Sequence, residues 1–118
     1  MKKEVEFLLN NSLAEPSISP WASPCLLISK PDGSSRFCTD FRKLYKVTVP
    51  DSYPLLLIDD VLDSIGQSHY ETTVDLLKGY HQIPLSEQAK SISAFITPFG
   101  FYQYTVMPFG LSNTTATF

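Results

Sequence analysis

Apolar residues recur at helical spacing in two segments of the chain. In residues 4–13 they share one face of a helix, at Val5, Leu8, Leu9 and Leu13. In residues 58–65 they stand at i, i+3, i+4 and i+7, and Gly66 follows where a helix would end. The pattern therefore predicts two short amphipathic helices.

Residues rich in β-formers indicate strands elsewhere. Residues 25–29 and 35–39 predict a hairpin around residues 30–33, where proline suits the second turn position and glycine the fourth. If Lys30 pairs with Ser35, the two cysteines stand on a diagonal of the hairpin. This geometry favours free, buried thiols over a disulfide.

Three further strands are expected beyond the second helix. Residues 69–74 alternate in polarity and predict a half-buried strand that delivers Asp75 near its end. Residues 91–97 and 101–107 predict two strands joined through Pro98 and Gly100. Strands and helices in this order predict an α+β fold.

The remaining segments read as connections. Three prolines make residues 14–24 an extended connection with Trp21 as its large anchor, and two more make residues 47–57 an irregular crossing. Ser112 or Asn113 is a suitable N-cap for a helix that starts close to the last residue.

Composition limits the class of protein. The chain has 118 residues, 43% hydrophobic and 18% charged, which indicates one packed domain or part of one and excludes a disordered chain. The longest apolar run, residues 55–58, is too short to cross a bilayer, and no signal segment opens the chain. We expect an intracellular protein, cytoplasmic or nuclear and not secreted.

Charge is unevenly distributed. The chain carries a net charge of −3, yet residues 30–46 hold five basic residues against two aspartates, a local charge of +3. Phosphate binding requires such a local basic patch. From charge alone, an ordinary solvated strand face is the favoured interpretation.

Asp75 is the sharpest candidate for chemistry, because a carboxylate at a strand end can hold a divalent cation. Taken alone it is weak evidence, because most aspartates are solvated or cap a helix, and Asp75 could cap the turn through residues 77–80. Its surroundings favour the first interpretation. Residues 74–76 (VDL) and 79–83 (GYHQI) resemble the first palm motif of reverse transcriptases from gypsy-class LTR retrotransposons.

Other blocks of that family follow in the family's order. Residues 19–24 (SPWASP), 31–38 (PDGSSRFC) and 40–44 (DFRKL) are similar to its fingers motifs. Residues 106–113 (VMPFGLSN) are similar to the loop before the next palm helix, which residues 116–118 continue. Several ordered blocks are far more specific than any one of them.

The resemblance implies a partial fingers and palm of a right-hand polymerase that stops before the palm is complete. The whole chain, residues 1–118, would be one partial reverse transcriptase domain. About residues 1–74 would be mainly fingers and connection, and about residues 75–118 the start of the palm. The complete enzyme would use an RNA or DNA template–primer and deoxynucleotide triphosphates.

Roles for single residues follow from the same resemblance. Asp75 would be one ligand of a two-Mg²⁺ site for nucleotidyl transfer to a primer 3′ hydroxyl. Tyr80 matches the aromatic residue that excludes a ribose 2′-hydroxyl, although it could also be a core tyrosine. Phe109 and Gly110 match the loop that lies against the incoming nucleotide.

Two arginines match the fingers. Arg36 would grip the triphosphate, a task suited to its planar fork of donors, and Arg42 would contact the template, with a plain surface ion pair as the alternative. Ser29 stands where the family usually has a second basic residue, and Lys30, one position along, is the remaining candidate for nucleotide binding. Tyr45 replaces an expected asparagine.

The Tyr-x-Asp-Asp motif of the family is missing from this sequence. After Asp75 there is no aspartate, and Glu87 is the only remaining acid. The adjacent pair Asp59 and Asp60 fits the first turn of the second helix. We therefore expect that this polypeptide alone does not polymerise DNA, and incorporation of labelled nucleotide that Asp75→Asn abolishes would contradict this.

Two other interpretations remain open at this stage. The chain could be a noncatalytic nucleic-acid or protein-binding remnant of a decayed retrotransposon, which salt-sensitive binding that weakens in Arg36→Ala and Arg42→Ala would support. It could also lack a stable fold, which cooperative unfolding would contradict.

Overall fold

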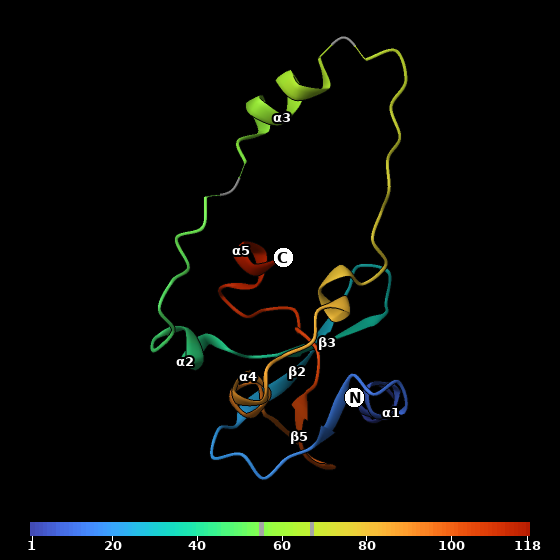
Figure 1. Ribbon diagram of the computed structural model, residues 1–118. Coiled ribbons are helices and arrows are strands. Elements are labelled where there is room, and N and C mark those ends of the chain that lie inside the picture. Colours follow the sequence, from blue (N-terminus) through green and yellow to red (C-terminus); the bar gives the residue numbers. More distant parts are fainter. Residues whose placement is uncertain (55, 67) are drawn as a thin grey trace.

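A computed structural model describes residues 1–54, 56–66 and 68–118. Its five strands form one sheet in the order β1-β5-β4-β2-β3 (Figure 1). The strands are β1 (Ala14–Pro16), β2 (Ser23–Ser29), β3 (Ser35–Thr39), β4 (Phe95–Thr97) and β5 (Gly100–Tyr104). The helices are α1 (Lys2–Asn10), α2 (Arg42–Tyr45), α3 (Ile58–Ile65), the 3-10 helix η1 (Gly79–Gln82), α4 (Glu87–Ile92) and α5 (Thr114–Thr117).

The sheet joins the two ends of the chain. Strand β1 pairs antiparallel with β5, and β2 pairs parallel with β4, so both contacts link the first 30 residues to residues 95–104. The other two pairs, β2–β3 and β4–β5, are antiparallel hairpins. The result is a mixed α+β fold, as the sequence predicted.

The core lies between α1 and the sheet. Its buried members are Leu8, Ala14, Phe41, Phe95 and Tyr104. The Phe95 ring is fully buried, and its centroid lies 4.6 Å from that of Tyr104. Burial of a large aromatic side chain contributes several kcal/mol. These rings are therefore central to the stability of the body of the molecule, residues 1–45 and 79–118.

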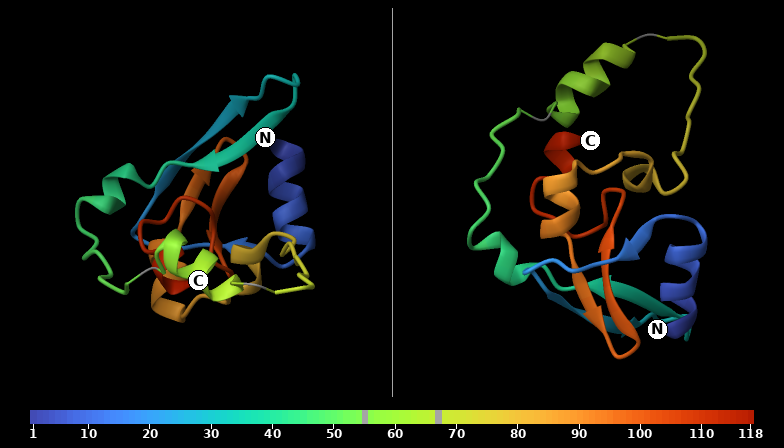
Figure 2. Two further views of the ribbon diagram at one scale, coloured as in Figure 1. Left: turned by 90° about the horizontal axis from the view of Figure 1, so that it is seen from above. Right: turned by 60° about the horizontal axis from the view of Figure 1, so that its bottom comes forward.

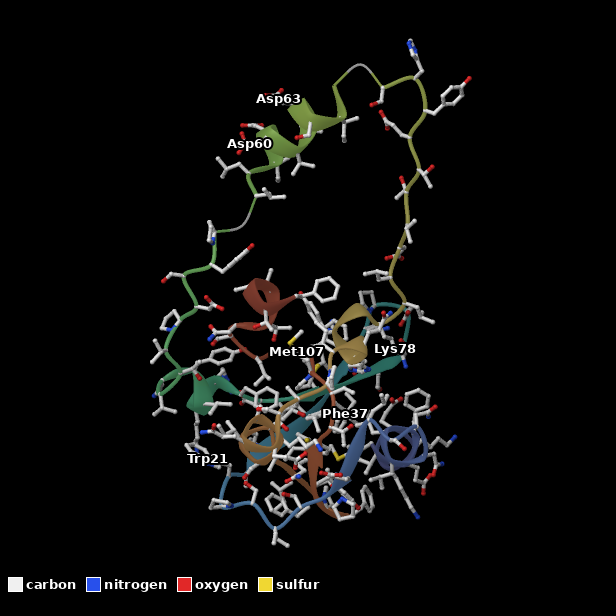
Figure 3. The ribbon with its side chains drawn as sticks, in the orientation of Figure 1. Trp21, Phe37, Asp60, Asp63, Lys78 and Met107 are labelled. Atoms are coloured by element: carbon white, nitrogen blue, oxygen red, sulfur yellow. The ribbon has the colours of Figure 1, made fainter. Side chains whose placement is uncertain are left out.

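Residues 46–78 leave the body and return to it, with α3 at the far side of the loop (Figures 1 and 2). The first-turn acids expected on this helix are in place, and Asp60 and Asp63 lie far from Phe37 of the body (Figure 3). The apolar face predicted for α3 exists, but its side chains are exposed, from 40% for Ile65 to 77% for Ile58. The crossing of residues 47–57 is irregular as expected, apart from Leu55, which lies outside the described residues.

The hairpin was predicted correctly, but its register was wrong by one residue. Lys30 belongs to the turn, where its N–H donates to the Ser34 carbonyl at 2.8 Å, so Ser29 and not Lys30 pairs with Ser35. Gly33 has φ of 78°, which glycine adopts without strain. Both cysteines are free, as expected, but they are half-buried and not fully buried as predicted.

Two other strand predictions need correction. Residues 69–74 form no strand, because no neighbouring strand among the described residues pairs with their backbone. Residues 91–93 end α4, which Ser86 caps by accepting the Ala89 N–H, and the strand begins only at Phe95. Within the proline-rich connection, three residues pair with β5 as β1, which local pattern did not indicate. No helix in the described ranges has the length and hydropathy of a membrane span.

Candidate nucleotide-binding site

The tip of the β2–β3 hairpin is held by its own side chains. The Asp32 carboxylate accepts hydrogen bonds from the Ser34 hydroxyl at 2.6 Å and the Ser34 N–H at 2.9 Å. These bonds hold the pKa of Asp32 below its ordinary value, because they favour its charged form. The fixed turn therefore determines where Lys30, in the turn, and Arg36, on β3, lie along the hairpin.

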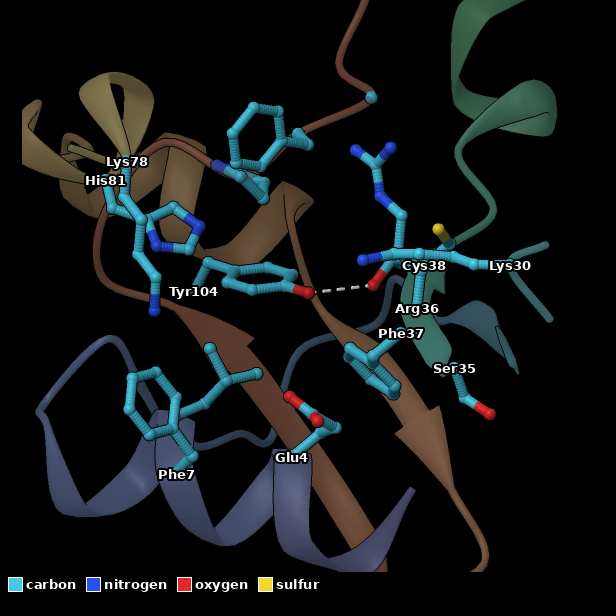
Figure 4. Close-up of a pocket in the computed structure, with 15 residues that line it drawn as sticks. Glu4, Phe7, Lys30, Ser35, Arg36, Phe37, Cys38, Lys78, His81 and Tyr104 are labelled. Atoms are coloured by element: carbon cyan, nitrogen blue, oxygen red, sulfur yellow. Dashed lines mark hydrogen bonds between the residues drawn. The ribbon is translucent and has the colours of Figure 1, made fainter. Parts of the chain in front are cut away.

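Arg36 and Lys30 line a pocket of about 350 Å³ between α1, β3, η1 and the loop of residues 106–113. Figure 4 shows these two cations on one side of the pocket and Lys78 and His81 on the other. Glu4 of α1 is the carboxylate on its wall. The predicted nucleotide residues Phe109 and Gly110 also line this pocket.

Asp75 and Tyr80 line a second pocket of about 460 Å³, which shares Lys78 and Phe109 with the first. Asp75 is exposed on an irregular segment and not at the end of a strand. The turn after it is closed by η1 and by a hydrogen bond of 3.0 Å from the Gln82 side chain to the Leu77 carbonyl. Asp75 therefore lies on the irregular segment that leads into this turn, and it shares its pocket with Phe109 of the loop of residues 106–113.

Phe109 connects the predicted nucleotide residues. The Arg36 guanidinium lies 5.7 Å from the centroid of the Phe109 ring, and the Tyr80 ring lies 5.0 Å from it. The fingers hairpin, the turn after Asp75 and the loop before α5 thus meet at one aromatic side chain. An arginine over an aromatic face is an attractive cation–π arrangement.

The Gly110 backbone is held by a residue of α2. Gly110 has φ of 97°, a conformation that favours glycine, and its carbonyl accepts a hydrogen bond from the Tyr45 hydroxyl. Tyr45, a departure from the expected asparagine, therefore still links α2 to this loop. Asn113 is the N-cap residue of α5, as one of the two expected candidates, but its side chain makes no cap hydrogen bond. Instead it donates to the Val49 carbonyl at 2.9 Å and accepts from the Asp51 N–H at 3.1 Å, which ties the loop to residues 49–51.

Arg42 lies apart from this group and lines neither pocket. Its guanidinium forms a bidentate ion pair with Asp40, with a shortest N–O distance of 2.7 Å, while 81% of the side chain is exposed. Hydrogen bonds from Arg42 lower the pKa of Asp40 to about 2. The surface ion pair weighed from sequence exists, and it orients an exposed arginine.

Among the pocket residues that were not singled out from sequence are Glu4, Lys78 and His81, whose side chains can carry charge. Burial and the nearby Lys78 charge lower the pKa of His81, whose Nδ1 finds no hydrogen-bond partner among the described residues. Lys78 lies between Asp75 and Tyr80, and that position was the available signal. Glu4 could not be found locally, because α1 is far away in sequence.

The residues around Asp75 do not fit a two-metal centre by themselves. In the described ranges, no three His, Cys, Asp or Glu side chains gather to hold a metal ion, and Asp75 is the one carboxylate lining its pocket. Two metal ions about 4 Å apart require several shared oxygen ligands. This chain alone therefore supplies a single candidate ligand.

The β2–β3 hairpin, the segment that bears Asp75 and the glycine-containing loop before α5 thus converge on one aromatic side chain, Phe109. Residues 28–118 match the family described as reverse transcriptase (RNA-dependent DNA polymerase), and the chain belongs to this family. Reverse transcriptases generally use a divalent metal ion. Membership favours a polymerase fragment over a noncatalytic remnant.

Relatives and solved structures agree with this assignment. The chain is 43% identical over its whole length to a retrovirus-related Pol polyprotein from transposon 297 of Drosophila melanogaster, and 36% identical to that from transposon gypsy. It superimposes on the foamy virus protease–reverse transcriptase (TM-score 0.82, 27% identity), covering 97% of this chain and 15% of that one. A structure of the foamy viral enzyme in complex with double-stranded DNA gives a TM-score of 0.85 at 24% identity, covering 99% of this chain and 25% of that one.

The chain spans about 12% of the length of these transposon polyproteins. It corresponds to part of their reverse transcriptase region. The fold matches the fingers and palm portion of solved reverse transcriptases, which confirms the fold class predicted from sequence.

Proposed function

We propose that this chain provides the nucleotide-binding face of an RNA-directed DNA polymerase. The observation that carries the proposal is the meeting of Arg36 and Tyr80 at Phe109, from segments more than 25 residues apart. In the complete enzyme the substrates would be deoxynucleotide triphosphates and the reaction nucleotidyl transfer to a primer 3′ hydroxyl.

Each side chain has a task that its chemistry suits. Arg36 presents a fork of donors to phosphate oxygens, and Lys30 adds charge at the hairpin. Tyr80 packs edge-on against Phe118 at 5.2 Å and tilted against Phe109, so its ring is held in place to exclude a 2′-hydroxyl. The Gly110 backbone, without a Cβ, allows a nucleotide to approach closely.

A template–primer duplex would lie along the fingers beside Arg42. Solved foamy viral relatives are in complex with double-stranded DNA and with an RNA/DNA hybrid, which supports a nucleic-acid partner for this chain as well. Arg42 is exposed and oriented by Asp40, as a phosphate contact requires. An intracellular location, cytoplasmic or nuclear, suits these substrates.

Asp75 would be one Mg²⁺ ligand of the complete enzyme. On its own it cannot position two ions, so nucleotidyl transfer would require further carboxylates of the complete enzyme. What its residues do is bind and orient: Arg36 the phosphates, Tyr80 the sugar and Arg42 the template strand.

The test separates nucleotide from duplex binding with two matched arginine variants. In an NMR titration of the chain with dGTP, we expect the backbone amide chemical shifts of residues 36, 80 and 110 to change. Arg36→Gln should weaken dGTP roughly tenfold, because it loses a charge-assisted contact. Arg42→Gln should leave dGTP binding intact and weaken a template–primer duplex severalfold at low salt.

Equal effects of the two variants on dGTP would contradict the proposed site. Primer extension by the same protein should be blank, because one carboxylate cannot hold two metal ions. Extension that Asp75→Asn abolishes would show instead that this chain is a complete catalyst.

A further inference from the structure

Lys78 occupies the turn between the pocket of Arg36 and the pocket of Asp75. It precedes η1 with φ of 49° and ψ of 47°, a left-handed conformation that non-glycine residues rarely adopt. The chain reverses at this residue, and the reversal places Lys78 on the walls of both pockets. Phe109 is the other residue that both pockets share, and Lys78 is the shared cation.

The Lys78 ammonium has no carboxylate partner. The ion pairs among the described residues join Lys2 to Glu6, Arg42 to Asp40 and Lys90 to Glu87. The Lys78 Nζ lies instead 4.1 Å from the centroid of the Phe7 ring. A cation–π contact of this kind is weak at a partly exposed site, so a phosphate group can displace it.

The charged residues that line the first pocket are mostly positive. Lys30 and Arg36 lie on the hairpin wall, Lys78 lies on the opposite wall, and Glu4 is the carboxylate among the lining residues (Figure 4). Cations on two facing walls suit a ligand with several phosphate groups better than a single small anion. The charge on Lys78 also helps to keep the neighbouring His81 neutral.

The sequence departs from its family at a hairpin position that would serve phosphate binding. Ser29 stands where a second basic residue is expected, and Ser29 is an exposed strand residue that lines neither pocket. Lys30, the next residue along, is the hairpin cation that lines the first pocket beside Arg36. Lys78 adds a third cation from the other wall.

We propose that Lys78 binds the phosphates of the incoming nucleotide from the palm side of the pocket, opposite Arg36. This inference rests on the proposed nucleotide site. The lysine stem leaves the Phe7 ring and brings its three N–H donors to the phosphate oxygens, while Arg36 holds them from the fingers side. Lys78 thus adds a third positive charge to those of Lys30 and Arg36.

Calorimetric titration of the full chain with inorganic tripolyphosphate at low salt tests this role. Lys78→Met keeps the length of the side chain without its charge and should weaken binding roughly tenfold, as expected for one charge-assisted contact. Lys3→Met on α1 removes the same charge outside both pockets and should change binding less than twofold. Lys78→Arg should retain the affinity.

A purely structural role for Lys78 would give different results. Phe7→Leu removes the aromatic partner and keeps the ammonium, so binding should persist; a loss as large as that of Lys78→Met would overturn the inference. Circular dichroism of every variant verifies the fold, and Lys78→Gln replaces Lys78→Met if that variant unfolds.

The same titration of Arg36→Gln distinguishes failure of the proposed nucleotide site from failure of the role of Lys78. If Arg36→Gln weakens tripolyphosphate binding and Lys78→Met matches Lys3→Met, only the role of Lys78 is wrong. If the unaltered chain does not bind tripolyphosphate, or if neither Arg36→Gln nor Lys78→Met weakens binding, both the site and the role of Lys78 are wrong.

Discussion

His81 is a residue whose charge the fold opposes. Burial and the positive Lys78 lower its pKa from the ordinary value of 6.5, and its buried Nδ1 has no hydrogen-bond partner in the part of the chain that the structure describes. The unfolded chain has neither constraint and takes up a proton near pH 6.5. Acid therefore favours the unfolded chain, because that state binds the additional proton.

We expect the free energy of unfolding to fall as pH is lowered from about 7.5 to about 5.5 and to level off below the folded pKa. Urea denaturation at both pH values measures this. His81→Gln should flatten the dependence. His69→Gln, at the exposed second histidine, is the matched control and should leave it unchanged. If the free energy of unfolding of His81→Gln depends on pH as that of the unaltered chain does, other titratable groups cause the pH dependence.

Local sequence identified the residues that now meet at Phe109, because their motifs are short and ordered along the chain. It did not show that Arg36 and Tyr80 contact the same ring, which depends on packing between distant segments. Nor did it reveal Glu4, for the same reason. Lys78 was within reach of sequence reasoning, since it lies inside the motif that contains Asp75.

At the scale of elements, the two amphipathic helices and the hairpin were predictable because their patterns are local, whereas α2 and α4 were not predicted. The helix around residues 58–65 and the strands of the β2–β3 hairpin lie where periodicity placed them, within a residue or two. Residues 69–74 failed because a strand also requires a hydrogen-bonding neighbour, which periodicity cannot supply. Residues 91–93 failed because the Ser86 cap outweighed their β-propensity.

The exposed face of α3 makes a testable contrast with the core. Leu62 is 58% exposed, whereas Phe95 is fully buried. We expect Phe95→Ala to lower the free energy of unfolding by about 3–5 kcal/mol, and Leu62→Ala by less than about 1 kcal/mol. Chemical denaturation measures both values. Similar losses would mean that α3 packs on the body in solution.

At the scale of the whole molecule, the sheet is what sequence patterns could not assemble. The β1–β5 and β2–β4 pairs join residues about 70 to 90 positions apart, and no local signal specifies such partners. The order of predicted strands and helices supplied the α+β class, and the resemblance to a polymerase family supplied the fingers and palm. The strand order had to come from the structure.

The excursion of residues 46–78 gives the molecule two halves that interlock. Strands from the first half hydrogen-bond to strands from the second, while the described residues between them add no strand to the sheet. A peptide bond cut near α3 should therefore leave two polypeptides that remain one complex. We expect limited proteolysis to nick this loop first, with both fragments co-eluting in gel filtration and separating only in denaturant; fragments that separate without denaturant would show that the strand pairs cannot hold the halves together.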